Sequence, residues 1–217
     1  MQERSQETVG RILASAGRLL ARGTAPQGLT TAQIAAEAGL SVGALYRFFH
    51  DKQAIVDAIA LRHLEAFQDT LAAALMANLP DSPGGFLDAA IDAFAAYLEA
   101  NADFRTLAYG PPGGDGRAIS RSLFDAQMGS PASAAPQADT GEAEAGDMAA
   151  MVRDVLSGMY GLETDADFDF RLRIAAEIGD RLFAHGFAQQ DPGQRARVIS
   201  EAKHVLRSYL FNQFEHR

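Results

Sequence analysis

The chain contains neither cysteine nor tryptophan among its 217 residues. Without cysteine there is no disulfide, thiolate zinc site, iron–sulfur cluster or cysteine nucleophile. No run of about 18 uncharged apolar residues occurs, so the sequence offers no candidate membrane-spanning helix, and its first residues lack the apolar stretch of a secretory signal. We therefore expect a cytoplasmic protein with no membrane partner.

Basic residues are scarce, because 19 Lys and Arg stand against 28 Asp and Glu, for a formal net charge of −9. Taken alone, this charge argues against a nucleic-acid partner, since DNA affinity depends largely on cationic contacts to phosphate. The acidity is uneven, however. Residues 1–60 carry six basic and five acidic side chains, whereas residues 61–217 carry thirteen and twenty-three. This asymmetry predicts two units with different partners.

Apolar residues recur at three- and four-residue intervals along most of the chain, which is typical of amphipathic helices. Capping residues precede several of these stripes, among them Thr30, Ser41, Asp51 and Ser82. Strand alternation bounded by hairpin turns is nowhere convincing. The sequence therefore predicts an all-α protein of about nine or ten helices.

Residues 30–49 are the most informative stretch. Thr30 opens a short helix through a capping box, Gly39 supplies the positive φ of a tight turn, and Ser41 caps a second helix that we expect to extend through Phe49. Two short helices joined by such a turn make a helix-turn-helix, whose second helix can lie in the major groove of DNA.

The second helix of this motif begins with three small residues, Val42, Gly43 and Ala44. They let the backbone approach base edges and can touch thymine methyl groups. Tyr46 and Arg47 follow, within reach of phosphates or of base acceptors. This helix is therefore the candidate DNA-reading surface.

The same stretch resembles the DNA-binding domain of the TetR family of bacterial transcriptional regulators, over roughly residues 8–60. The matching positions are Thr30, Ile34-Ala35, Ala38-Gly39, Ser41, Gly43, Leu45-Tyr46, Phe49 and Lys52. The resemblance implies two sets of DNA contacts: Thr30 or Thr31, Tyr46 and Lys52 on phosphates, and Val42, Gly43, Ala44 and Arg47 on bases. Ser41 joins these DNA-binding candidates. Phe48 departs from the family, whose members often carry His or Tyr there.

A homodimer is expected because residues 1–52 hold six basic and four acidic side chains, too small an excess for one copy to bind DNA tightly. The last two predicted helices carry apolar residues on more than one face and must be buried on several sides. The resemblance implies a four-helix interface between two subunits, and packing within one chain is the alternative. The dimer candidates are Ile174, Ile178, Leu182, Ile199, Leu206 and Tyr209.

Aromatic residues and methionines lie between the DNA-binding and dimer regions, and such side chains can line an adaptable pocket for an apolar ligand. The pocket follows mainly from the family, whose members typically bind a small molecule there and release DNA, and the alternative is that these residues are core. The ligand-binding candidates are Phe67, Phe94, Tyr97, Phe104, Phe124, Met151 and Met159.

We accordingly expect a helix-turn-helix domain at residues 1–52 and a helical ligand-binding and dimerisation domain at residues 53–217. Residues 129–146 are rich in small residues, Pro and Glu, hold no large apolar residue, and predict a disordered loop.

Together these patterns predict a homodimeric, ligand-responsive transcriptional regulator, most simply a repressor released from operator DNA by a small apolar molecule. The same residues are compatible with an activator. No nucleophile motif or ligand-spaced histidine pair appears, and the acidic run at residues 165–169 lacks the glycine and glutamate of a calcium loop. We therefore expect no enzymatic activity, metal or cofactor. The alternative is an α-helical carrier or enzyme that retains a degenerate helix-turn-helix.

Overall fold

The computed structural model describes residues 2–111, 148–163 and 165–211, and every regular element in these ranges is helical. The predicted all-α fold is confirmed. The elements are α1 (Gln2–Ala21), the 3-10 turn η1 (Pro26–Gly28), α2 (Thr31–Glu37), α3 (Val42–Leu45), α4 (Lys52–Ala77), α5 (Pro83–Ala100), α6 (Ala102–Tyr109), α8 (Met148–Tyr160), α9 (Ala166–Ala188) and α10 (Pro192–Phe211). The helical piece predicted at residues 118–128 and the loop predicted at residues 129–146 lie outside the described residues.

The helix-turn-helix is fixed by local capping. Thr30 Oγ1 accepts a hydrogen bond from the Gln33 N–H at 3.2 Å, and the Thr30 N–H donates to Gln33 Oε1 at 3.0 Å. Ser41 Oγ likewise accepts from the Ala44 N–H at 3.2 Å. Between the two helices, Gly39 has a φ of +65°, a left-handed conformation that glycine adopts without a steric penalty. Both predicted caps and the predicted turn are confirmed.

The second helix of the motif is shorter than predicted, because α3 ends at Leu45 and not at Phe49. Beyond it the backbone changes to hydrogen bonds between residues three apart, with the Arg47 N–H donating to the Ala44 carbonyl and the Phe48 N–H to the Leu45 carbonyl. Such bonds tighten the chain into turns. The predicted end of this helix was therefore wrong, and Tyr46 and Arg47 lie in the turn after α3.

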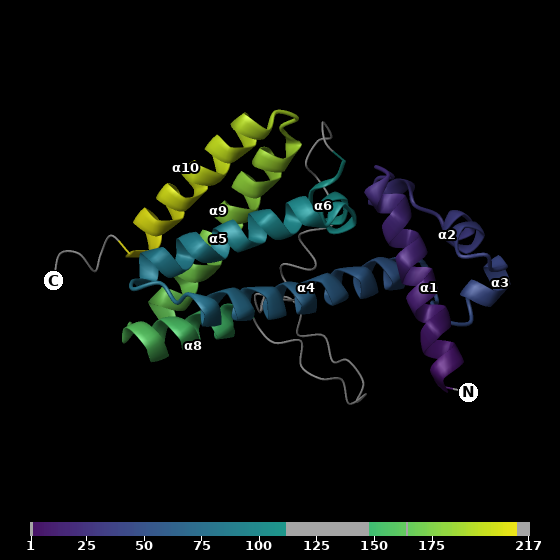
Figure 1. The fold of residues 1–217 in the computed structure, drawn as a ribbon, viewed down its shortest axis with the longest axis horizontal. Coiled ribbons are helices and arrows are strands. Elements are labelled where there is room, and N and C mark those ends of the chain that lie inside the picture. The colour runs from purple at the N-terminus through teal and green to yellow at the C-terminus, as the bar shows by residue number, and fades with distance from the viewer. Residues whose placement is uncertain (1, 112–147, 164, 212–217) are drawn as a thin grey trace.

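The helix α4 runs from the helix-turn-helix end of the molecule to the opposite end (Figure 1). Asp51 caps it, since its carboxylate accepts from the Ala54 N–H at 2.8 Å. Near its start α4 packs on α1, and further along it packs on α5. The helix α4 thus packs on both the helix-turn-helix end and the remaining helices, and it connects these two parts of the molecule.

The C-terminal helices α9 and α10 pack closely together, and α10 also packs on α5 (Figure 1). Gly179 of α9 permits this approach, because a Cβ there would lie 3.3 Å from Leu206 Cδ1 of α10. Phe168, Phe183 and Phe187 of α9 are buried, and α9 also packs on α6 and α8. Helices α6, α8 and α10 of its own chain thus already cover part of α9.

Most of the buried apolar side chains form one cluster that extends from α1 to α10. It includes Ile12 and Leu45 at the helix-turn-helix end and Leu98 and Phe168 in the rest of the molecule. The short helix α6 lies at the centre of this arrangement and packs on α1, α4, α5 and α9. Within the described ranges, no helix combines the length and the apolar character needed to cross a bilayer.

Candidate nucleic-acid interface

The helices α2 and α3 lie beyond α1 at one end of the molecule (Figure 1). On α3 and the turn after it, Tyr46 is 50% exposed, Val42 is 39% exposed, and Gly43 and Arg47 are also exposed. Leu45, by contrast, is fully buried. Of the candidate base-reading residues, Val42, Gly43 and Arg47 therefore face outwards and Ala44 is half-buried, while Leu45 anchors the helix from inside.

Two of the candidate phosphate-binding residues are brought together across the helix-turn-helix. Thr31 is the first residue of α2 and Tyr46 follows the last residue of α3, and their Oγ1 and Oη atoms lie 3.3 Å apart. Both hydroxyls can donate a hydrogen bond. Paired hydroxyls at an exposed surface can serve one phosphate, a contact that positions a protein on the duplex without reading sequence.

Three other candidates make internal contacts. The hydroxyl oxygens of Thr30 and Ser41 are acceptors in the helix caps, and Lys52 Nζ donates to the carbonyls of Pro26 and Gln27 at 3.3 and 3.1 Å. Lys52 therefore ties the η1 turn to the start of α4. Sequence analysis did not anticipate this role, because no local pattern joins residues 25 positions apart.

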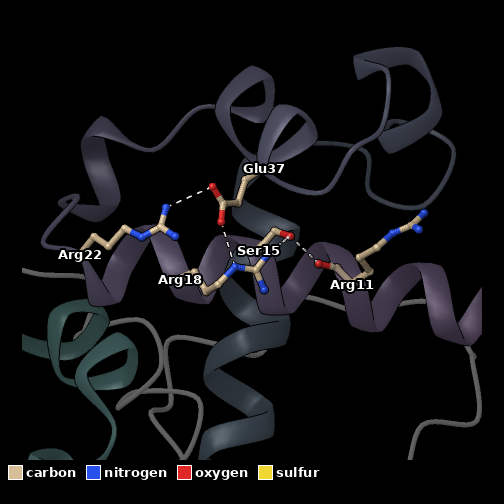
Figure 2. Close-up of polar contacts among 5 residues, drawn as sticks. All are labelled: Arg11, Ser15, Arg18, Arg22 and Glu37. Carbon is tan, nitrogen blue, oxygen red and sulfur yellow. Dashed lines mark hydrogen bonds and ion pairs between the residues drawn. The ribbon is translucent and has the colours of Figure 1, made fainter.

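Sequence analysis also missed the ion pairs that fix α2 on α1 (Figure 2). Arg18 Nε lies 2.9 Å from Glu37 Oε1, and Arg22 Nη1 lies 3.2 Å from Glu37 Oε2. Arg18 Nη2 also donates to Ser15 Oγ at 2.9 Å. The hydrogen bond from Arg18, aided by Arg22, holds the pKa of Glu37 below its usual value. Arg18 and Arg22 are thus engaged by α2, which leaves less positive charge for DNA.

Four of the ligand-binding candidates form one aromatic cluster, which we call the ring cluster: Phe67, Phe94, Tyr97 and Phe104. The Phe67 ring lies 5.1 Å from that of Phe94 and 5.5 Å from that of Tyr97, and the Tyr97 and Phe104 rings are 5.9 Å apart. Phe183 of α9, not among the candidates, joins at 5.1 Å from Phe94. Four of the seven ligand-binding candidates thus lie together, between α4, α5, α6 and α9.

The remaining ligand-binding candidates do not join the ring cluster. Met159 is 55% exposed near the end of α8. Phe124 and the side chain of Met151 lie outside what the structure describes. Among the described residues, no group of three or more His, Cys, Asp and Glu side chains could hold a metal ion.

The dimer candidates divide by burial. Ile199 and Leu206 are buried by the packing of α9 and α10 within the chain, so they serve the core of one subunit. The others keep part of their surface exposed. The residues that remain available to a second copy are Ile174, Ile178, Leu182 and Tyr209.

The helices α2 and α3, with the turn at Gly39 between them, define a helix-turn-helix protein. Comparison with family models identifies the family of regulators to which it belongs. The family model described as "Bacterial regulatory proteins, tetR family" matches residues 12–59, and that described as "Tetracyclin repressor-like, C-terminal domain" matches residues 124–214. Together they cover more than half of the chain. The chain belongs to the TetR family of bacterial transcriptional regulators, which confirms the resemblance read from residues 30–52. No curated protein sequence matches it.

Solved structures of transcriptional regulators have a similar fold. A TetR-family transcriptional regulator from Streptomyces coelicolor is 24% identical, with a TM-score of 0.65 over 94% of this chain and 98% of that one. A transcriptional regulator from Cytophaga hutchinsonii is 11% identical, with a TM-score of 0.56 over 93% and 95%. A tetR-family protein from Mesorhizobium loti is 18% identical, with a TM-score of 0.54 over 95% and 96%. At these identities the likeness shows the fold alone.

Proposed function

We propose that the protein is a cytoplasmic, homodimeric repressor that holds operator DNA through α3 and is released by a small apolar ligand. The observation that carries this proposal is the outward face of α3, where Val42, Gly43, Tyr46 and Arg47 are exposed while Leu45 is buried. A helix presented in this way can enter a major groove, about 12 Å wide, with its small residues against base edges.

Charge supports two copies per operator. Of the basic residues in the helix-turn-helix unit, Arg18 and Arg22 pair with Glu37, and Lys52 binds backbone carbonyls. One copy therefore offers few cations to phosphate, and a dimer doubles them across half-sites about 34 Å apart. The partly exposed apolar residues of α9, Ile174 among them, support α9 and α10 as the dimer helices.

The ring cluster supports an apolar ligand. Its side chains come from α4, α5 and α6, and α6 packs directly on α1, which carries the helix-turn-helix. A ligand that enters between these rings would be surrounded by aromatic surface, the usual lining of small-molecule sites. Release of DNA then requires only that the ligand prefer a subunit arrangement whose two α3 helices no longer match the half-sites.

Two substitutions on the exposed face test the assignment of DNA contacts. Arg47→Ala is expected to weaken operator binding by about 1–3 kcal/mol, because it removes a cation that reaches bases or phosphate. Tyr46→Phe removes only a hydroxyl and is expected to weaken binding by about 1.5–3 kcal/mol, typical of a hydrogen bond to a charged group. Fluorescence anisotropy with labelled DNA from the region flanking the gene measures both.

The matched control is Arg197→Ala, which removes an exposed arginine from α10, away from α3. It should bind DNA as tightly as the unaltered protein. Unchanged affinity in both the Arg47→Ala and Tyr46→Phe variants would contradict the assignment of contacts. Absence of any sequence-dependent complex in the unaltered protein would favour the carrier or enzyme alternative.

A further inference from the structure

A chain of hydrogen bonds crosses the middle of the molecule through three helices. Tyr97 Oη of α5 lies 2.9 Å from Nδ1 of His63 on α4, and His63 Nε2 lies 3.1 Å from Oδ2 of Asp103 on α6. A carboxylate is an acceptor, so His63 Nε2 carries the ring proton and donates a hydrogen bond to Asp103. In this neutral ring, Nδ1 accepts a hydrogen bond from the Tyr97 hydroxyl. A change in the hydrogen bond made by the Tyr97 hydroxyl therefore affects the hydrogen bond that the Asp103 carboxylate accepts from His63.

The same carboxylate oxygen is in close contact with the DNA-binding unit. Gly17 is buried on α1, and a Cβ at this position would lie 2.9 Å from Asp103 Oδ2, closer than real Cβ atoms approach. A side chain at position 17 would therefore push the Asp103 carboxylate from its place beside His63. Burial alone would raise the pKa of Asp103, but the hydrogen bond from His63, with backbone N–H groups, holds it below its usual value.

The rest of α6 is held equally firmly. Phe104 stacks on the His63 ring with centroids 4.9 Å apart. At the other end of α6, Tyr109 is buried, hydrogen-bonds Asp180 of α9, and stacks on Phe187 at 6.1 Å. Burial, with the Asp180 charge, raises the pKa of Tyr109 well above its usual value. A shift of α6 would therefore also displace the residues of α1, α4 or α9 that pack on it.

We propose that Asp103 is a positioning residue that sets the placement of α1, and so of the helix-turn-helix, according to whether the Tyr97 hydroxyl donates its hydrogen bond to His63. The inference rests on the proposed function, because a ligand within the ring cluster is what would engage the Tyr97 hydroxyl. The ligand class is an apolar molecule that carries one hydrogen-bond acceptor. Such an acceptor takes over the hydrogen bond of the Tyr97 hydroxyl, leaves His63 Nδ1 without its donor, and weakens the hydrogen bond from His63 to Asp103.

Two glycine substitutions on the same helix isolate the contact. Gly17→Ala places a methyl group against Asp103 Oδ2, whereas Gly10→Ala meets nothing within 4 Å. Both replace a helical glycine with a better helix former, so their intrinsic effects on α1 are alike. Gly17→Ala is expected to displace the carboxylate and lower operator affinity about tenfold, within the range of coupling between sites. Gly10→Ala is expected to match the unaltered protein.

A third variant perturbs the contact between Asp103 and Gly17 through His63. Tyr97→Phe keeps the ring and removes the proton donor, so it remains informative if Gly17→Ala fails to fold. Two measurements on the free, full-length chain follow the coupling: the imidazole ¹⁵N shifts of His63, assigned with a His63→Gln variant, and amide hydrogen exchange across α1, α2 and α3. Both are expected to change in Gly17→Ala and Tyr97→Phe, and to stay unchanged in Gly10→Ala.

The results separate this inference from the proposed function. Unchanged amide exchange in α1 to α3 of Gly17→Ala and Tyr97→Phe would overturn the coupling, even if the His63 signals shift. So would a Gly10→Ala variant that behaves like Gly17→Ala. If exchange changes as expected while the unaltered chain binds no operator DNA, the coupling is supported and the repressor function is contradicted.

Discussion

Replacing Leu45 with alanine is expected to lower the free energy of unfolding by about 2–5 kcal/mol and to abolish operator binding. Leu45 is fully buried, and its neighbours on the four-residue helix α3 are exposed or half-buried. The side chain thus attaches α3 to the core cluster that holds Ile34 and Ile55. Without it, a cavity opens beneath the helix and α3 loses its anchor. Urea unfolding followed by circular dichroism measures the change in stability.

Val42→Ala is the matched control for this experiment, because Val42 lies on the same helix and is exposed. Its effect on stability should stay within about 0.5 kcal/mol, as for most surface changes. If the Leu45→Ala and Val42→Ala variants unfold at the same urea concentration, Leu45 does not anchor α3 and the account of the helix-turn-helix fails.

Replacing Phe168 with alanine is expected to lower the free energy of unfolding by about 3–5 kcal/mol. Phe168 lies in the first turn of α9, fully buried, just after the Asp165 carboxylate caps the helix by accepting from the Phe168 N–H at 2.8 Å. For a chain of this size the melting temperature should fall by about 6–20 °C. Differential scanning calorimetry measures it, and one transition is expected because the core is continuous.

Phe170 provides the control two residues along the same helix, since its ring is 54% exposed. Phe170→Ala should shift the melting temperature by no more than about 2 °C. A Phe168→Ala variant that melts at the same temperature as Phe170→Ala would show that the start of α9 is not part of the core.

Local features of the fold were predictable from sequence because their causes are local. The capping box of Thr30 and Gln33 and the cap at Ser41 each depend on residues within three positions of one another. Gly39 marks its turn because few other residues adopt a positive φ. The end of α3 was not predictable in this way. After Leu45, hydrogen bonds form between residues three apart in the sequence, and the residue types do not indicate this change.

Contacts between helices could not be read from the sequence. Periodicity assigns a residue to a face of its own helix, but it does not say which residue of another helix lies opposite. The pairing of Glu37 with Arg18, the contact of Lys52 with the η1 turn, and the approach of Asp103 to Gly17 depend on tertiary packing.

At the candidate sites, too, the sequence does not indicate which surface covers an apolar residue. Four of the ligand-binding candidates lie together in the ring cluster, but no pattern in the sequence places Phe183 of α9 against Phe94. Ile199 and Leu206 were expected to face a second copy, yet their own chain buries them. An apolar stripe therefore predicts burial without specifying whether the covering surface belongs to the same subunit.

The central claim is that two copies of the chain hold one DNA site through paired α3 helices. Sedimentation of the protein with DNA from the region flanking its gene, together with a hydroxyl-radical footprint, tests this most directly. The account predicts two protomers per site, protected half-sites about 34 Å apart, and affinity that falls as salt rises. A single bound protomer, or binding that ignores both DNA sequence and salt, would contradict it.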